Sequence, residues 1–282
     1  MARFNRVTIV GLGLIGGSLG MALRRRRLAT RVVGLSRTRA RINRAKALGA
    51  IDEGFTLAEA AVGDAEIVVL ATPVDAMLPL GKRLASLMKP GSILTDVGST
   101  KRRIVQGFER GLADGIAFVG AHPLAGSEQQ GIEAASPDLF TDALCIVTPT
   151  KRTDRRAVRA VTTLWKPLVR RVVTMDPERH DRVLAAVSHL PHVLAFCLVS
   201  ATDRQALELA PRSFLDATRV AQSDPELWDD ILLSNREAVL AAMSAFDRSW
   251  RQLHQMLTHR QRTALKRFLA HARTQRTRTH GT

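Results

Sequence analysis

Short apolar runs recur along the first 175 residues, separated by longer stretches in which apolar positions have helical spacing. The runs cover residues 7–10, 31–36, 66–72, 92–97, 117–122, 143–149 and 170–175. Runs that are apolar throughout are typical of strands buried on both faces, and strands that alternate with helices form parallel sheets. The pattern therefore predicts an α/β fold, a doubly wound parallel sheet wrapped by helices.

The alternation ends where Asp176, Pro177 and Glu178 have the order of an N-cap followed by proline at the first helical position. Only helical and loop patterns follow. We therefore expect a sheet domain over residues 1–175 and an all-α domain over residues 176–282. The arginine-rich end of the chain is predicted to be a flexible tail from about residue 272.

One predicted helix carries apolar residues at alternating spacings of four and three, which is typical of a seam that packs against another helix. The seam is formed by Val239, Met243, Phe246, Trp250, Leu253 and Leu257. We expect it to form a homodimer interface in the helical domain. An intramolecular core face is the open alternative.

The longest apolar stretch, residues 183–201, approaches the length of a membrane span. It contains His189, Pro191 and His192, and the chain has no second stretch of this kind. We therefore expect a buried core helix and no association with a membrane.

The first apolar run leads into a glycine-rich turn and then a helical pattern, the order required of a dinucleotide-binding fingerprint. Gly11 permits the tight turn, Gly13 lets the backbone approach a pyrophosphate, and Gly16 lets helix and strand pack closely. Leu14 and Ile15 begin the helix, whose free N–H groups suit phosphate. The first domain is therefore predicted to be a Rossmann domain that binds a nicotinamide dinucleotide.

The end of the second predicted strand bears on which dinucleotide is bound. An acidic residue there would bind the free 2′-hydroxyl of NAD, but the chain has Ser36 and Arg37. A hydroxyl and a guanidinium suit a 2′-phosphate, so the sequence favours NADP over NAD. The alternative is that Arg37 is only a solvated surface residue and that the protein does not distinguish NADP from NAD. Thr72 and Pro73 are expected beside the nicotinamide, with Pro73 starting the next helix.

Composition and charge narrow the class of protein. With 45% hydrophobic and 24% charged residues, the chain is globular. Its formal net charge of +16 would attract any phosphate, but no helix-turn-helix pattern accompanies that charge, so we expect no nucleic-acid partner. The start runs straight into a strand, and Cys145 and Cys197 lie in separate apolar runs. These features predict a cytoplasmic protein with reduced, buried thiols.

Two polar segments follow predicted strands: residues 96–101, which contain Ser99, and residues 122–128, which begin with His122. The carboxyl ends of parallel strands form the edge of the sheet where ligands bind. A hydroxyl and an imidazole are therefore expected to converge on the cofactor.

These two segments, with residues 188–192, 216–221 and 223–228, resemble the prephenate/arogenate dehydrogenase family over nearly the whole chain. The resemblance implies oxidative decarboxylation of prephenate to 4-hydroxyphenylpyruvate, of arogenate to tyrosine, or of both, by hydride transfer to a nicotinamide in tyrosine biosynthesis. The choice of substrate stays open. The alternatives are a pyrroline-carboxylate reductase or β-hydroxyacid dehydrogenase with a similar fold, and a nucleotide-sensing DNA-binding protein.

The resemblance implies that His122 accepts the hydroxyl proton of the substrate, a role for neutral imidazole. It also implies that Ser99 bonds the same hydroxyl and the nicotinamide. The alternative for Ser99 is the N-cap of the next helix.

The resemblance further implies that Arg219 holds a substrate carboxylate, a task for a planar bidentate donor. Asp216 is then expected to orient Arg219, and Glu128 to join this network. Ser127 is a further expected contact with the substrate.

His189 and His192 lie three residues apart on one side of a helix that Pro191 is expected to kink. The resemblance places His192 in the substrate pocket, and His189 is assigned to the core. A metal held by the two histidines would lack a convergent third ligand, so no metal is expected.

Overall fold

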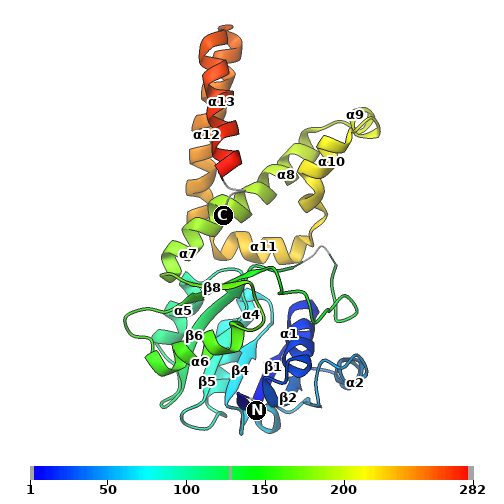
Figure 1. Ribbon diagram of the computed structural model, residues 1–282, viewed down its shortest axis with the longest axis vertical. Coiled ribbons are helices and arrows are strands. Elements are labelled where there is room, and N and C mark those ends of the chain that lie inside the picture. The colour runs from blue at the N-terminus through cyan, green and yellow to red at the C-terminus, as the bar shows by residue number, and fades with distance from the viewer. Residues whose placement is uncertain (1–2, 127–128, 279–282) are drawn as a thin grey trace. The chain divides into compact units, whose positions relative to one another are not determined.

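The computed structural model describes residues 3–126 and 129–278 (Figure 1). The chain divides into two compact units, Met1–Asn235 and Arg236–Thr282. The helices that follow the sheet are therefore shared between the two units. The predicted domain boundary between residues 175 and 176 stays a prediction.

The first unit contains one sheet of eight strands in the order β3-β2-β1-β4-β5-β6-β7-β8. All neighbouring strands are parallel except β6 and β7, so the sheet is mostly parallel, as predicted. Each predicted apolar run overlaps a strand. The strands are β1 (Phe4–Val10), β2 (Ala29–Leu35), β3 (Glu53–Phe55), β4 (Ile67–Leu70), β5 (Ile93–Asp96), β6 (Ala117–Pro123), β7 (Leu144–Thr148) and β8 (Arg171–Thr174).

Two features of the sheet differ from the prediction. β3 was missed because its three residues are only partly buried and do not form an apolar run. β7 runs antiparallel to β6, with His122 paired to Ile146. The described residues between these strands contain no helix, and an antiparallel return needs no helical crossover.

Helices cover both faces of this sheet (Figure 1). They are α1 (Leu14–Arg25), α2 (Arg39–Ala47), α3 (Ala58–Val62), α4 (Val74–Ala85), α5 (Arg102–Glu109) and α6 (Arg155–Trp165). Along β4, Ile67 and Val69 belong to one buried core, and Val68 and Leu70 to the other. Burial on both faces explains why the strands are apolar throughout.

The rest of the first unit is helical. Its elements are α7 (Pro177–Leu184), the π-helical turn η1 (Ala185–His189), α8 (Leu190–Ala201), α9 (Arg204–Glu208), α10 (Arg212–Thr218), the 3₁₀ turn η2 (Arg219–Gln222) and α11 (Pro225–Ser234). The predicted start of α7 is confirmed: the Asp176 side chain accepts hydrogen bonds from the N–H groups of Glu178 and Arg179, and Pro177 is the first helical residue.

The segment Pro177–Ala201 is long and apolar enough to cross a membrane by length and composition, but only 22% of its apolar window is buried. Val187 is 68% exposed and Leu198 is 45% exposed. The prediction of a buried core helix is therefore wrong for the single chain, because apolar side chains continue around exposed faces of the helix. Cys145 is buried and Cys197 is exposed, so only the first matches the predicted buried thiol.

The second unit consists of α12 (Arg236–Thr258) and α13 (Arg262–Arg278), which pack against each other. The predicted seam lies on α12, where Met243, Trp250 and Leu257 are 38%, 58% and 59% exposed. An intramolecular core face does not account for exposure of this size.

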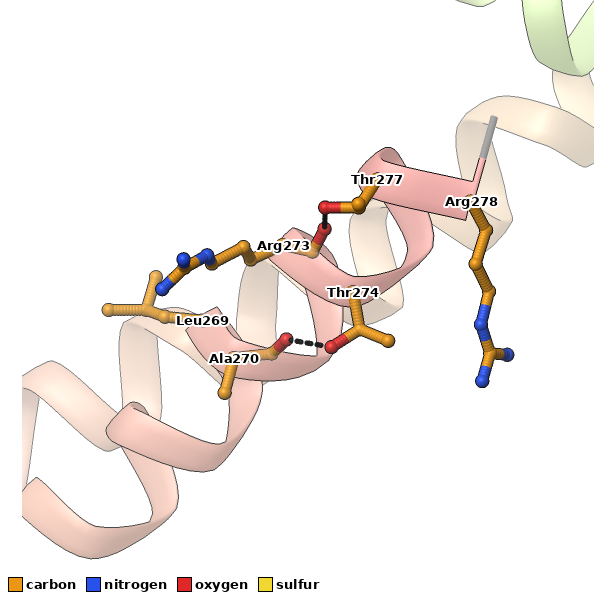
Figure 2. A pocket seen from close by; sticks show the side chains of 6 residues that line it. All are labelled: Leu269, Ala270, Arg273, Thr274, Thr277 and Arg278. Atoms are coloured by element: carbon orange, nitrogen blue, oxygen red, sulfur yellow. Dashed lines mark hydrogen bonds between the residues drawn. The ribbon is translucent and has the colours of Figure 1, made fainter. Parts of the chain in front are cut away.

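α13 continues to Arg278, so the flexible tail predicted from about residue 272 is helical as far as the structure describes it. A pocket on this helix is lined by Leu269, Ala270, Arg273, Thr274, Thr277 and Arg278 (Figure 2). The hydroxyls of Thr274 and Thr277 donate to carbonyls of their own helix. None of these residues belongs to the segments that carry candidate chemistry.

Candidate active site

The glycine turn between β1 and α1 is shaped by close backbone approaches. Gly11 has a φ of 101°, and a Cβ at this position would lie 2.5 Å from the Ala71 carbonyl oxygen. A Cβ at Gly16 would lie 2.0 Å from the Gly11 carbonyl oxygen, whereas a Cβ at Gly13 would meet no atom within 4 Å. Two glycines are thus required by the fold itself, and the third leaves open space in front of the helix.

The residues around this open space fit a dinucleotide phosphate. Gly13 is the N-cap of α1 and offers no side-chain cap, and the first turn contains no acidic residue. The N–H groups of Leu14 and Ile15 therefore lack intrahelical partners. The Thr72 hydroxyl is buried without a hydrogen-bond partner among the described residues, and its methyl group lies 3.2 Å from the Cβ position of Gly11.

Ser36 and Arg37 follow the end of β2, as predicted. Ser36 is partly buried and its N–H donates to the Phe55 carbonyl, while Arg37 is exposed. Thr38, not Ser36, caps α2 by accepting from the N–H of Arg41 at 3.4 Å. The Ser36 hydroxyl and the Arg37 guanidinium are therefore not used for capping.

The loop after β4 ends at Pro73, and α4 begins at Val74, one residue after the predicted start. Asp230 of α11 caps this helix: its carboxylate accepts from Val74 N–H at 2.6 Å and from Asp75 N–H at 3.2 Å. Burial raises the pKa of Asp230. The cap fixes α11 at the carboxyl edge of the sheet.

The loop after β5 is folded around a buried ion pair between Asp96 and Lys101, both fully buried. Asp96 also accepts from the N–H of Gly98 at 2.9 Å and from that of Ala121 at 3.2 Å. These bonds join the ends of β5 and β6. Ser99 lies between the paired residues and is partly buried.

Asp181 of α7 caps α5. Its carboxylate oxygens accept from the N–H groups of Lys101 and Arg102 at 2.7 and 2.9 Å. Lys101, not Ser99, is the N-cap residue of this helix. The alternative assignment of Ser99 as an N-cap is therefore wrong, and its hydroxyl makes no hydrogen bond within the described part of the chain.

His122 lies at the end of β6 and is 9% exposed. Its Nδ1 atom is 2.9 Å from Nε2 of His180, and Nδ1 of His180 is 2.8 Å from Oδ1 of Asp181. Burial, reinforced by the neighbouring His180, Lys101 and His189, holds the pKa of His122 well below its ordinary value. The imidazole is therefore neutral near pH 7, the state required of a proton acceptor.

The two downstream histidines meet Trp228 of α11. The His192 ring stacks on the indole at 3.6 Å between centroids, and the His189 ring approaches it edge-on at 6.0 Å. His189 is buried, as predicted, and burial lowers its pKa to about 4. Burial also lowers the pKa of His192, and the nearby Arg219 charge adds to this effect.

The irregularity predicted at Pro191 takes the form of the π turn η1, which immediately precedes α8. Pro191 has no N–H to donate one turn back, and a widened turn is a common response to such a loss. The Ser188 carbonyl then accepts from Nδ1 of His192 at 2.9 Å, which fixes the direction of the ring.

Arg219 and Asp216 are the members of the predicted carboxylate-binding group that lie in the described part of the chain. Arg219 begins η2 and is exposed. Asp216 was expected to orient Arg219. Its Oδ2 atom forms an exposed ion pair with Nε of Arg212, one helical turn earlier, at 3.9 Å. Ser127 and Glu128 lie outside the described residues.

Sequence reasoning missed several buried groups, namely Asp96, Lys101, His180, Asp181 and Asp230. One signal for His180 was present: it lies four residues before Leu184, on the face of the helix that is buried. The partners of these residues are distant in sequence and have no local signature.

Comparison with known proteins covers both parts of the chain. The family model described as "Prephenate dehydrogenase, nucleotide-binding domain" matches residues 19–174, and "Prephenate dehydrogenase, dimerization domain" matches residues 176–271. A prephenate dehydrogenase from Bacillus subtilis is 36% identical over 260 residues, which are 90% of this chain and 69% of the relative.

Two solved structures are similar over almost their whole length. Prephenate dehydrogenase from A. aeolicus, in complex with hydroxyphenyl propionate and NAD+, has a TM-score of 0.90 and 34% identity and covers 98% of both chains. Arogenate dehydrogenase from Synechocystis has a TM-score of 0.85 and 30% identity, covering 97% of this chain and 99% of that one.

Proposed function

The chain belongs to the prephenate dehydrogenase family, and from this premise we propose that it oxidises and decarboxylates prephenate, arogenate or both in the synthesis of tyrosine. The observation that carries the proposal is a buried, neutral His122 at the same edge of the sheet as an open dinucleotide turn. We also propose a cytoplasmic location, where Cys145 and Cys197 remain free thiols.

The proposed reaction removes a hydride and carbon dioxide from opposite ring carbons. A bound nicotinamide supplies the hydride acceptor. His122 takes the proton of the ring hydroxyl as that carbon becomes a carbonyl, and Ser99 bonds the same oxygen. When the carbon–carbon bond to the leaving carboxylate breaks, its electron pair enters the ring, and the proton returns from His122 to the oxygen. The ring is then aromatic, which drives the reaction.

The other proposed residues hold the two ends of the substrate. Arg219 binds a carboxylate, with Asp216 and Glu128 orienting it, while His192 and Ser127 contact the substrate side chain. The His192 ring stacks on Trp228, which supports a fixed position for His192 in its proposed contact with the substrate.

Steady-state assays with prephenate and arogenate, each with NAD and NADP, test the proposed function. We expect turnover of at least one substrate, with release of carbon dioxide. Turnover of neither, in protein that binds a dinucleotide, would contradict it. A 3-hydroxy acid and a pyrroline carboxylate serve as substrates for the two alternative enzyme classes.

We propose NADP as the preferred cofactor, although the similar A. aeolicus structure contains NAD+. The support is the exposed Arg37 beside Ser36, with no acidic residue at the end of β2. Arg37→Asp should reduce the ratio of kcat/KM for NADP to that for NAD by about 10- to 100-fold, because a charged hydrogen bond contributes about 1.5–3 kcal/mol.

Arg31→Asp is the matched control, since Arg31 is an exposed arginine on β2, the strand that precedes Arg37, and pairs with Glu53 at 3.5 Å. It should leave the cofactor ratio unchanged. A wild-type preference for NAD, or an unaltered ratio in Arg37→Asp, would disprove the assignment.

We propose a homodimer that buries the exposed seam of α12. Burying an aromatic side chain contributes about 1.5–3 kcal/mol, so placing a charge there should disfavour association strongly. Trp250→Glu, or a charge at Phe246, should shift the protein from dimer to monomer in light scattering, with the helical circular dichroism retained. Ser249→Glu, an exposed neighbour on the same helix, should remain dimeric. A wild-type monomer at micromolar concentration would exclude the interface.

A further inference from the structure

We propose that His180 and Asp181 are positioning residues, which fix the hydrogen of His122 on Nδ1 and so leave Nε2 as the proton acceptor. This inference rests on the proposed function for its catalytic consequence. It assigns a role to two buried residues that the sequence analysis did not single out.

The first step concerns Asp181, whose carboxylate can only accept hydrogen bonds when ionised. Burial alone would raise the pKa of Asp181, but hydrogen bonds from His180 and from the N–H groups of Arg102 and Lys101 hold it below its usual range. Asp181 is therefore an anion, and the atom facing it at 2.8 Å, Nδ1 of His180, carries the hydrogen.

The second step passes through the His180 ring. Burial lowers the pKa of His180, so the ring is neutral and carries only one hydrogen. With that hydrogen on Nδ1, Nε2 has a lone pair, and it faces Nδ1 of His122 at 2.9 Å. His122 must therefore donate through Nδ1. Its other nitrogen, Nε2, is left with the lone pair that a proton acceptor needs.

The geometry also suits the charge that forms when His122 takes a proton. The positive ring is then linked through His180 to the carboxylate of Asp181. That carboxylate cannot swing away, because both of its oxygens are held by backbone N–H groups at the start of α5. A carboxylate that orients and stabilises an imidazolium performs the same task in serine proteases. Capping α5 alone would not require His180.

Two substitutions at His180 separate a positioning role from a structural one. His180→Met keeps the length of the side chain but removes the acceptor for His122, and we expect kcat to fall about 10²-fold or more with KM nearly unchanged. In His180→Gln, the amide oxygen can accept from Nδ1 of His122, so most of the loss should be recovered. His189→Gln, a buried histidine outside the relay, is the matched control and should retain wild-type kcat within a few fold.

Nitrogen-15 NMR of the histidine rings tests the same inference without substrate. In wild-type protein, Nδ1 of His122 should carry the hydrogen, and in His180→Met the ring should become a mixture of tautomers. A wild-type His122 with its hydrogen on Nε2 would overturn the inference. So would wild-type kcat in His180→Met, or equal losses in folded His180→Met and His180→Gln. If the wild type turns over neither substrate, the proposed function fails. The NMR result still shows which ring nitrogen of His122 carries the hydrogen, so it tests the positioning role separately.

Discussion

His122→Asn is expected to lower kcat about 10²- to 10⁴-fold, the usual effect of removing one well-placed acid–base group. The fold and the affinity for NADP should persist, because the substitution changes neither the glycine turn nor the strand. Asn can keep one polar contact with His180, which limits the structural damage. His254→Asn, on an exposed histidine of α12, is the control and should retain full activity.

The pH profile gives this prediction a second readout. Neutral His122 is the active form, and burial holds its pKa well below the ordinary value of 6.5. Wild-type activity should therefore stay level as the pH falls through 6.5 and decline only in more acidic solution. In His122→Asn, the residual activity should lack this acid limb. Near-wild-type turnover, or an unaltered acid limb, would exclude His122 as the base and make His192 the next candidate.

Arg219→Lys is expected to raise KM for the cyclohexadienyl substrate about 10- to 100-fold, because lysine cannot replace a bidentate contact with a carboxylate worth about 1.5–3 kcal/mol. Cofactor affinity should be nearly unchanged, since the glycine turn does not involve this residue. Arg212→Lys is the control, because Arg212 is exposed and pairs only loosely with Asp216, at 3.9 Å.

Parallel measurement of KM for substrate and cofactor separates the roles open to Arg219. A rise in the substrate KM alone supports carboxylate binding. A loss of affinity for both ligands points to a structural role, and an unchanged KM for both removes Arg219 from the substrate pocket.

The features predicted correctly from the sequence are those set by local patterns. Strands buried on both faces must be apolar throughout, so every long strand could be located. The glycine turn was equally accessible, because the order of strand, glycine-rich turn and helix is a local pattern, and Gly11 has a φ of 101° that favours glycine. The N-cap at Asp176 follows the same logic.

The features that escaped prediction depend on contacts between distant residues. His122 and His180 are 58 positions apart, Lys101 and Asp181 are 80 apart, and Val74 and Asp230 are 156 apart. No periodicity connects such pairs. The exposure of Pro177–Ala201 was missed for another reason: an apolar pattern reports that a surface will be covered, but not whether the same chain covers it.

The π turn of Ala185–His189 changes the side of the helix on which the following residues lie. His180 and His189 are nine positions apart, which at about 100° per residue would place them on opposite sides of a regular α-helix. Both are nevertheless buried, at 0% and 1% exposure. A π turn accommodates one extra residue, so the helix beyond it is rotated by about 100°. With the π turn between them, the two buried histidines are about 80° apart around the helix and not on opposite sides. Deleting a single residue of this turn would preserve every functional group yet rotate His192 away from Trp228.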